Sequence, residues 1–269
     1  MNPILLAVII VAGIGILAGA LLAVLSKIMA VPVDEKAAAI EEILPGANCG
    51  ACGFSGCSGY AAALSGGKTT NTGLCAPGGN AVSGKIAGIM GLAAENVEPM
   101  TALVLCRGNN ENANKKMVYE GVPSCKMASQ LFGGDKACIY GCLGLGDCAR
   151  ECPYNAIMLC DGAAVVNPDI CRACKRCVNV CPKHLIALVP KSQMSAAVLC
   201  KNHDKGALTR KECKAGCIGC TKCVKACPNG AISMDNNAAV VDYAKCTACG
   251  ACVEGCPTGA IELLRAADE

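Results

Sequence analysis

The sequence of 269 residues has few aromatic side chains: no tryptophan, two phenylalanines and five tyrosines. A large aromatic core is therefore excluded, and so is a stacking platform for bases or for a flavin ring. Only His184 and His203 are present, and neither has a motif around it, which excludes a Ser/His/Asp set. No G-x-G-x-x-G after a strand and no P-loop lysine is found. The net charge of +3 is small, which argues against a nucleic-acid partner.

The first 26 residues also lack any ionisable side chain. Because about 20 apolar helical residues cross the hydrocarbon core of a bilayer, we expect a transmembrane anchor over residues 1–29. A signal peptide is the alternative, but no Lys or Arg precedes the run and no convincing cleavage site follows it. Lys27 and Lys36 lie just after the run, so the positive-inside bias places the soluble part on the cytoplasmic side of a single-pass inner-membrane protein.

Cysteine, in contrast, is abundant, with 25 residues. We expect an α+β chain of small cysteine-pinned domains, beginning with a domain near the membrane over residues 33–95. Asp34 caps a predicted helix that Pro45-Gly46 ends, and residues 79–95 form a second helix. A connecting segment with extra cysteines, residues 96–130, follows.

The C-terminal half repeats itself with an offset of 75 residues, as from Cys142 to Cys217. Nine cysteines and several other residues coincide at this offset, for example Pro153 with Pro228. The chain therefore contains two tandem modules, which we predict to be ferredoxin-like and to cover residues 131–190 and 191–269.

The second module carries two consecutive C-x2-C-x2-C-x3-C-P runs, the pattern that binds [4Fe-4S] clusters. Three thiolates of each run hold one cluster, and the fourth cysteine ligates the neighbouring cluster. Zinc knuckles or disulfides are the alternatives, and neither matches this spacing. Each set therefore combines the first three cysteines of one run with the fourth cysteine of the other. The first set is Cys217, Cys220, Cys223 and Cys256, and the second is Cys246, Cys249, Cys252 and Cys227.

The first module departs from this pattern because Leu145 occupies the position equivalent to Cys220. Cys138 lies four residues before Cys142, and we predict that it supplies the missing ligand. The predicted sets are Cys138, Cys142, Cys148 and Cys181, and Cys171, Cys174, Cys177 and Cys152. Cys213, the counterpart of Cys138, is then expected to be a buried or free thiol.

A further cysteine group lies near the anchor, where Cys49-Gly-Ala-Cys52-Gly-Phe-Ser-Gly-Cys57 precedes Cys75. Four thiolates in a glycine-rich loop suit another [4Fe-4S] cluster, with zinc as the alternative. The segment CGACGFSGCSGY after one N-terminal span, followed by ferredoxin-type repeats, resembles the B subunits of Rnf complexes. These complexes are membrane-bound ferredoxin:NAD oxidoreductases that pump sodium ions or protons. The resemblance covers essentially the whole chain, although the simplest members of the family carry one ferredoxin-type module.

Four more cysteines remain, and counting alone allows them to hold a sixth cluster or to be separate buried thiols. They are Cys106, Cys125, Cys160 and Cys200. Iron analysis distinguishes about 20 iron atoms per chain, for five clusters, from about 24, for six.

The resemblance implies that reduced ferredoxin donates electrons, which pass through the modules to membrane-embedded and flavin-bearing partner subunits that reduce NAD. The chain itself has no catalytic site beyond electron transfer. Residues 172–225 hold twelve Lys and Arg against two acidic residues, which indicates either a docking face for an acidic ferredoxin or compensation of cluster charge. The functional alternatives are an iron-sulfur subunit of a hydrogenase-type membrane complex and a non-redox zinc or iron module.

Overall fold

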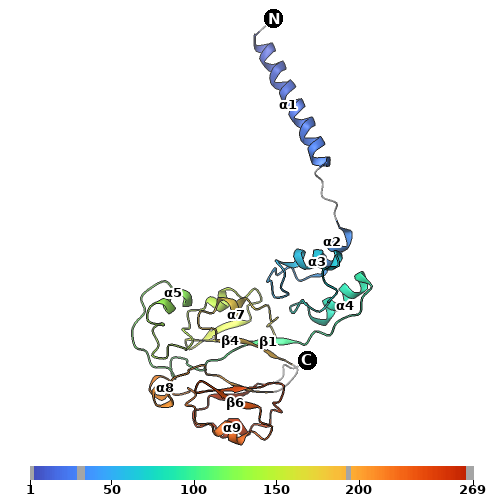
Figure 1. The fold of residues 1–269 in the computed structure, drawn as a ribbon. Coiled ribbons are helices and arrows are strands. Elements are labelled where there is room, and N and C mark those ends of the chain that lie inside the picture. Colours follow the sequence, from blue (N-terminus) through green and yellow to red (C-terminus); the bar gives the residue numbers. More distant parts are fainter. Residues whose placement is uncertain (1–2, 29–33, 192–194, 265–269) are drawn as a thin grey trace.

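A computed structural model describes residues 3–28, 34–191 and 195–264 of the chain. Figure 1 shows an isolated N-terminal helix, a small helical domain below it, and two modules that follow one another away from the helix. Helix α1 (Pro3–Ile28) contains a window, Ile9–Ser26, with a mean hydropathy of 2.6 and no buried residue. By length and composition it is the one helix of the described residues that could cross a membrane.

The helical domain, residues 34–95, is called the membrane-proximal domain below. It contains α2 (Glu35–Ile43), α3 (Cys57–Ser65) and α4 (Gly79–Met90), which pack around Ile40, Tyr60, Leu64 and Ile86. The predicted cap is confirmed, because the Asp34 carboxylate accepts hydrogen bonds from the backbone N–H of Lys36 and Ala37 at 3.0 and 3.2 Å. The predicted helix over 79–95 is shorter, because Gly91 adopts a left-handed φ of 67° and ends α4.

Module 1 begins earlier than predicted. Strand β1 (Met100–Val104) pairs antiparallel with β4 (Ile186–Pro190), although it lies in the predicted connecting segment. A second pair joins β2 (Ile157–Cys160) to β3 (Ala163–Val166). Three short helices complete the module, α5 (Cys125–Gln130), α6 (Asp147–Arg150) and α7 (Arg176–Val180). We therefore define module 1 as residues 100–190, which corrects the predicted start at residue 131.

Module 2, residues 195–264, has the same two strand pairs. Strand β5 (Ser195–Val198) pairs with β8 (Ile261–Leu264), and β6 (Ile232–Asp235) pairs with β7 (Ala238–Val241). Its helices are α8 (Gly206–Glu212), α9 (Lys222–Ala226) and α10 (Ala251–Glu254). The predicted boundaries at residues 29, 33 and 269 lie outside the described residues, and the predicted boundary at 191 lies beside an undescribed segment.

The two modules contact each other directly through the segment that follows β1. The backbone N–H of Arg107 donates to the Leu199 carbonyl at 3.1 Å, and its guanidinium donates to the Gly259 carbonyl at 3.0 Å. Ala113 and Cys213 form an isolated antiparallel bridge. Since Arg107 and Ala113 belong to module 1 and their partners to module 2, the junction is built from both modules.

Candidate functional site

The structure brings the four cysteines of the membrane-proximal domain together in one group, the membrane-proximal site (Cys49, Cys52, Cys57 and Cys75). Burial raises the pKa of Cys75 to about 11, and the three other cysteines are close enough to raise it further. The loop is fixed by Asn48, whose side-chain oxygen accepts a hydrogen bond from the Cys57 backbone N–H at 2.8 Å. Gly50 and Gly53 adopt φ values of 70° and 89°, which few other residues tolerate.

Two predicted sets occupy equivalent places in the two modules. We name them site 1B (Cys152, Cys171, Cys174 and Cys177) and site 2B (Cys227, Cys246, Cys249 and Cys252), and each lines a cavity. In both sites a backbone N–H from the first strand of the module donates to a cysteine sulfur. Ala102 donates to Cys171 at 3.3 Å, and Ala196 donates to Cys246 at 3.4 Å. The repeat therefore preserves the hydrogen bonds to sulfur as well as the cysteines.

The third predicted set of the modules is also brought together, as site 2A (Cys217, Cys220, Cys223 and Cys256), around another cavity. Burial raises the pKa of Cys223 to about 11, with Cys217 and Cys220 adding to the effect. Cys220 is exposed, as is Cys249 of site 2B, whereas Cys174, the counterpart of Cys249 in module 1, is buried.

The set predicted around Cys138 needs correction. The cavity of module 1 is lined by Cys125, Cys142, Cys148 and Cys181, which we name site 1A, while Cys138 lines a different cavity. Burial raises the pKa of Cys148 to about 12, and Cys142, Cys125 and Cys181 raise it further, in agreement with their proximity. Cys125 thus takes the place left by Leu145.

Helix α5 brings Cys125 to site 1A, and Asp147 holds this helix in place. The buried Asp147 carboxylate accepts hydrogen bonds from the Ser124 hydroxyl at 2.9 Å and the Lys126 N–H at 3.0 Å, and it pairs with Arg150. Burial alone would raise the pKa of Asp147, but these hydrogen bonds outweigh it and the pKa is lowered. The cysteine pattern did not indicate this contact between Asp147 and the start of α5.

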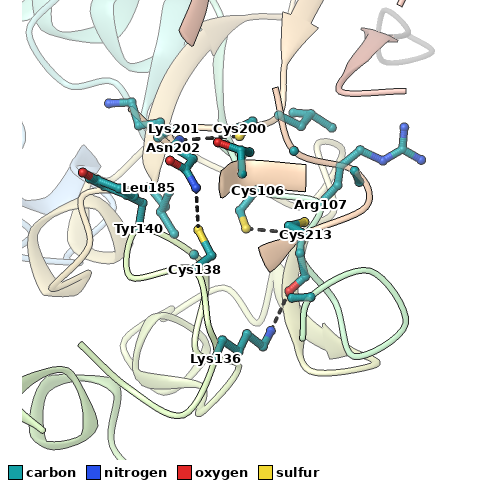
Figure 2. Close-up of a pocket in the computed structure, with 17 residues that line it drawn as sticks. Cys106, Arg107, Lys136, Cys138, Tyr140, Leu185, Cys200, Lys201, Asn202 and Cys213 are labelled. Carbon is teal, nitrogen blue, oxygen red and sulfur yellow. Dashed lines mark hydrogen bonds between the residues drawn. The ribbon is translucent and has the colours of Figure 1, made fainter. Parts of the chain in front are cut away.

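Cys138 lies at the junction of the modules in a fourth group, the central site (Cys106, Cys138, Cys200 and Cys213). These cysteines line one cavity, and Figure 2 shows their side chains around it. Two come from module 1 and two from module 2. Burial raises the pKa of Cys138 to about 12, with Cys106 and Cys200 contributing, and raises that of Cys106 to about 11.

The sulfurs of the central site receive several hydrogen bonds. Backbone N–H groups of Gly108 and Cys142 both donate to Cys106 at 3.3 Å, and the buried Asn202 amide donates to Cys138 at 3.4 Å. The Cys217 backbone amide lowers the pKa of Cys200 in the corresponding way, although burial raises it overall. Since Cys142 belongs to site 1A and Cys217 to site 2A, the central site is connected to both modules.

Cys213 is buried, as expected, and it lines the central site, whereas the four cysteines Cys106, Cys125, Cys160 and Cys200 do not form one group. Cys106 and Cys200 line the central site, Cys125 lines site 1A, and Cys160 ends strand β2 as an exposed residue. The sequence contained a signal for this arrangement. Segments TALVLC, ending at Cys106, and SAAVLC, ending at Cys200, are the equivalent first strands of the two modules, with their following cysteines.

The arrangement of these cysteines fits [4Fe-4S] clusters better than single metal ions. Among the described residues, no group of three or more His, Cys, Asp or Glu is close enough to hold one ion, as the short Zn–S bond of about 2.3 Å requires. A four-iron cluster instead spreads its four thiolates around a larger core. The N–H groups directed at sulfur are the environment that cluster ligands require.

Tyr154 adds an observation of the same kind. Within the described structure its hydroxyl is buried and has no hydrogen-bond partner. Burial raises the pKa of this hydroxyl, and Cys174 of site 1B and Cys49 and Cys75 of the membrane-proximal site raise it further. A buried donor without an acceptor, placed between two groups of cysteines, fits a sulfur-rich acceptor there.

Comparisons with known proteins support iron-sulfur domains in this chain. A family model described as a putative Fe-S cluster matches residues 44–76, and two models described as 4Fe-4S dicluster domains match residues 170–232 and 216–260. Every cysteine from Cys106 to Cys160 lies outside all three matches.

Three curated proteins are similar over most of the chain. The chain is 40% identical to the B subunit of the Na(+)-translocating ferredoxin:NAD(+) oxidoreductase complex of Acetobacterium woodii, covering 91% of this chain and 73% of the relative. It is 39% identical to the B subunit of the ion-translocating oxidoreductase complex of Methanosarcina acetivorans (88% and 89%). It is also 39% identical to the B subunit of the proton-translocating ferredoxin:NAD(+) oxidoreductase complex of Clostridium ljungdahlii (90% and 85%).

Proposed function

The chain belongs to the family of B subunits of ion-translocating ferredoxin:NAD oxidoreductase complexes, the Rnf complexes, and on this premise we propose that it transfers electrons through six [4Fe-4S] clusters. The clusters would be held by the membrane-proximal, 1B, 1A, central, 2A and 2B sites. When bound, each such cluster exchanges one electron at a time. The main observation behind the proposal is that 24 of the 25 cysteines fall into six groups of four.

The six sites form one series along the molecule. Cys49 of the membrane-proximal site contributes to the raised pKa of Cys174 in site 1B, so these two sites are neighbours. Cys177 of site 1B acts in the same way on Cys148 of site 1A. The central site follows, through the Cys142 N–H, and leads to site 2A through the Cys217 amide. Sites 2A and 2B then share one buried core.

The two ends of this series differ in ways that suit different partners. At the far end, Cys220 and Cys249 are exposed and the N-terminus of α9 presents Lys222 next to Cys223, which suits the approach of a small acidic ferredoxin. At the near end, the Arg176 guanidinium donates to the Ala47 carbonyl at 2.9 Å and joins module 1 to the membrane-proximal domain. We propose that electrons enter at module 2 and leave toward membrane-embedded subunits.

For the anchor, we propose that α1 crosses the membrane once and leaves the remaining domains on the cytoplasmic side. The hydropathy of α1 and the two lysines after its apolar run support this orientation. Which ion is moved, and where NAD is reduced, would be decided by the partner subunits.

The number of clusters is tested by iron and acid-labile sulfide analysis of the anaerobically purified full chain. We expect about 24 iron atoms per chain. About 20 iron atoms, with no loss in a Cys138→Ser variant, would leave the central site empty. A colourless protein that contains zinc would contradict electron transfer altogether.

The surface at which ferredoxin docks is tested by reversing the charges of lysines at two places. Lys222 and Lys225 lie on α9 beside site 2A, whereas Lys211 and Lys214 lie at the end of α8 and just after it, near the junction of the modules. We expect Lys222→Glu with Lys225→Glu to slow reduction by ferredoxin and to weaken its salt dependence. A larger effect of Lys211→Glu with Lys214→Glu would move the face to the junction, and unchanged rates in both at low ionic strength would remove the docking proposal.

A further inference from the structure

Lys136 is a completely buried lysine at the central site, with an exposed fraction of 1%. Its ammonium donates hydrogen bonds to the Gly108 carbonyl at 2.6 Å and to the Gly162 carbonyl at 2.8 Å. Lys136 lines the cavity of the central site and lies below Cys138 and Cys213 in Figure 2. The sequence pattern gave no reason to single out this residue.

The ammonium of Lys136 has no carboxylate partner among the ion pairs of the described residues. Asp135, the acidic residue next to it in the chain, pairs with Lys115 instead. The positive charge of Lys136 acts on two thiols of the central site. Burial raises the pKa of Cys106 and of Cys213, and Lys136 partly offsets this rise in both.

The repeat supplies a natural comparison. Lys136 stands two residues before Cys138, and its counterpart Lys211 stands two residues before Cys213. Lys211 is exposed, and its backbone carbonyl accepts a hydrogen bond from the Asn114 side chain at 2.6 Å. Of these two equivalent lysines, only Lys136 is turned into the protein.

Burying a positive charge is costly unless an opposite charge lies beside it. Resting on the proposed function, we propose that Lys136 is the fixed countercharge of the cluster in the central site and raises the reduction potential of that cluster. A fixed positive charge favours the form that carries one more electron, and no proton or bond changes in this step. The hydrogen bonds from Gly108, Cys142 and Asn202 act in the same direction.

This role gives the junction a function in the electron path. An electron that reaches the central site from module 2 would be held there more strongly than at a site without a buried cation. Ferredoxin would deliver electrons on the side of module 2, and module 1 would pass them on. The central site at the junction would hold the electron between these two steps.

The test is a redox titration of the full chain followed by EPR, with Lys136→Met compared with Lys211→Met. The signal of the central site is the one that a Cys138→Ser variant loses. In Lys136→Met we expect this signal to titrate at a lower potential, with about 24 iron atoms retained. Lys211→Met should match the unchanged chain. An unchanged midpoint in Lys136→Met with full iron content would overturn the proposal.

Lys136→Arg keeps the charge and resolves the case in which Lys136→Met loses iron. If Lys136→Met loses about four iron atoms while Lys136→Arg keeps both iron and midpoint, the positive charge is required and the proposal stands. If both variants lose the same iron, the site depends on the shape of lysine and the proposal fails. An unchanged chain with only about 20 iron atoms would instead refute the six-cluster assignment, independently of Lys136.

Discussion

The two modules share their strand pairs and most of their cysteines, yet they complete their first cluster site by different routes. In module 2 the loop itself carries all three local ligands, and one of them, Cys220, is exposed. In module 1 Leu145 replaces that cysteine, and Cys125 reaches the site from a separate helix, α5. The segment between Cys106 and Cys138 is 19 residues longer than that between Cys200 and Cys213. On the proposed assignment, this insertion supplies the ligand that the loop of module 1 lacks.

The strongest test of this difference is Cys125→Ser. We expect it to remove about four of about 24 iron atoms, because site 1A would keep only three thiolates. Iron analysis with EPR measures the loss. Adding Leu145→Cys to this variant restores the loop pattern of module 2 and should restore the iron. If Cys125→Ser keeps all its iron, the assignment of Cys125 to site 1A is wrong.

A smaller effect is expected when the attachment of α5 is weakened by Asp147→Ala. The variant loses the hydrogen bonds that Ser124 and Lys126 donate to the carboxylate. Each is worth ~1–3 kcal/mol for a charged acceptor. A chelator should therefore remove iron from site 1A at least tenfold faster than from the unchanged chain. The matched control is Asp242→Ala in module 2, an exposed carboxylate that pairs with Lys245 at 3.3 Å and should contribute less than ~1 kcal/mol.

The lowered pKa of Asp147 also predicts how this attachment depends on pH. A carboxylate with a lowered folded-state pKa stabilises the protein above its unfolded value, about 3.9, and the contribution is lost as pH falls through the lower folded value. The rate at which a chelator removes iron should therefore differ between Asp147→Ala and the unchanged chain by a constant factor near neutral pH. This difference should disappear only in strong acid. A difference that disappears between pH 5 and 7 would contradict this interpretation.

Much of the fold could be predicted from the sequence because the signals were local. The Asp34 cap and the cysteine runs of module 2 each depend on a few neighbouring residues. The regrouping of Cys138 was missed because the offset of 75 residues aligns Cys125 with Cys200, while the first strands align Cys106 with Cys200 at an offset of 94. An insertion changes the offset within the repeat. Only strand pairing shows which of the two alignments reflects equivalent positions.

Tyr154 marks a further difference between the modules, since its counterpart Asn229 is exposed and donates to Thr247 at 2.7 Å. We expect Tyr154→Phe to keep its iron and to lower the midpoint potential of one site near Cys49 or Cys174, because a hydrogen bond to sulfur is lost. Redox titration followed by EPR measures this shift. Asn229→Ala is the control and should leave these two sites unchanged. Equal midpoints in Tyr154→Phe and the unchanged chain would show that the hydroxyl does not reach a cluster.

The smallest effect is expected at Cys160, the one cysteine outside the six groups of four. Its reactivity as a free thiol tests whether the other 24 cysteines are ligands. If 24 cysteines are ligands, the loaded protein has one free thiol, and that thiol is exposed at the end of β2. Iodoacetamide should then modify the loaded chain once, at Cys160, and Cys160→Ser should abolish this reaction without changing the iron content. Mass spectrometry of the labelled peptides identifies the site. Labelling of Cys106, Cys138, Cys200 and Cys213 in the loaded chain would instead show that the central site holds thiols, and the series between the modules would be interrupted there.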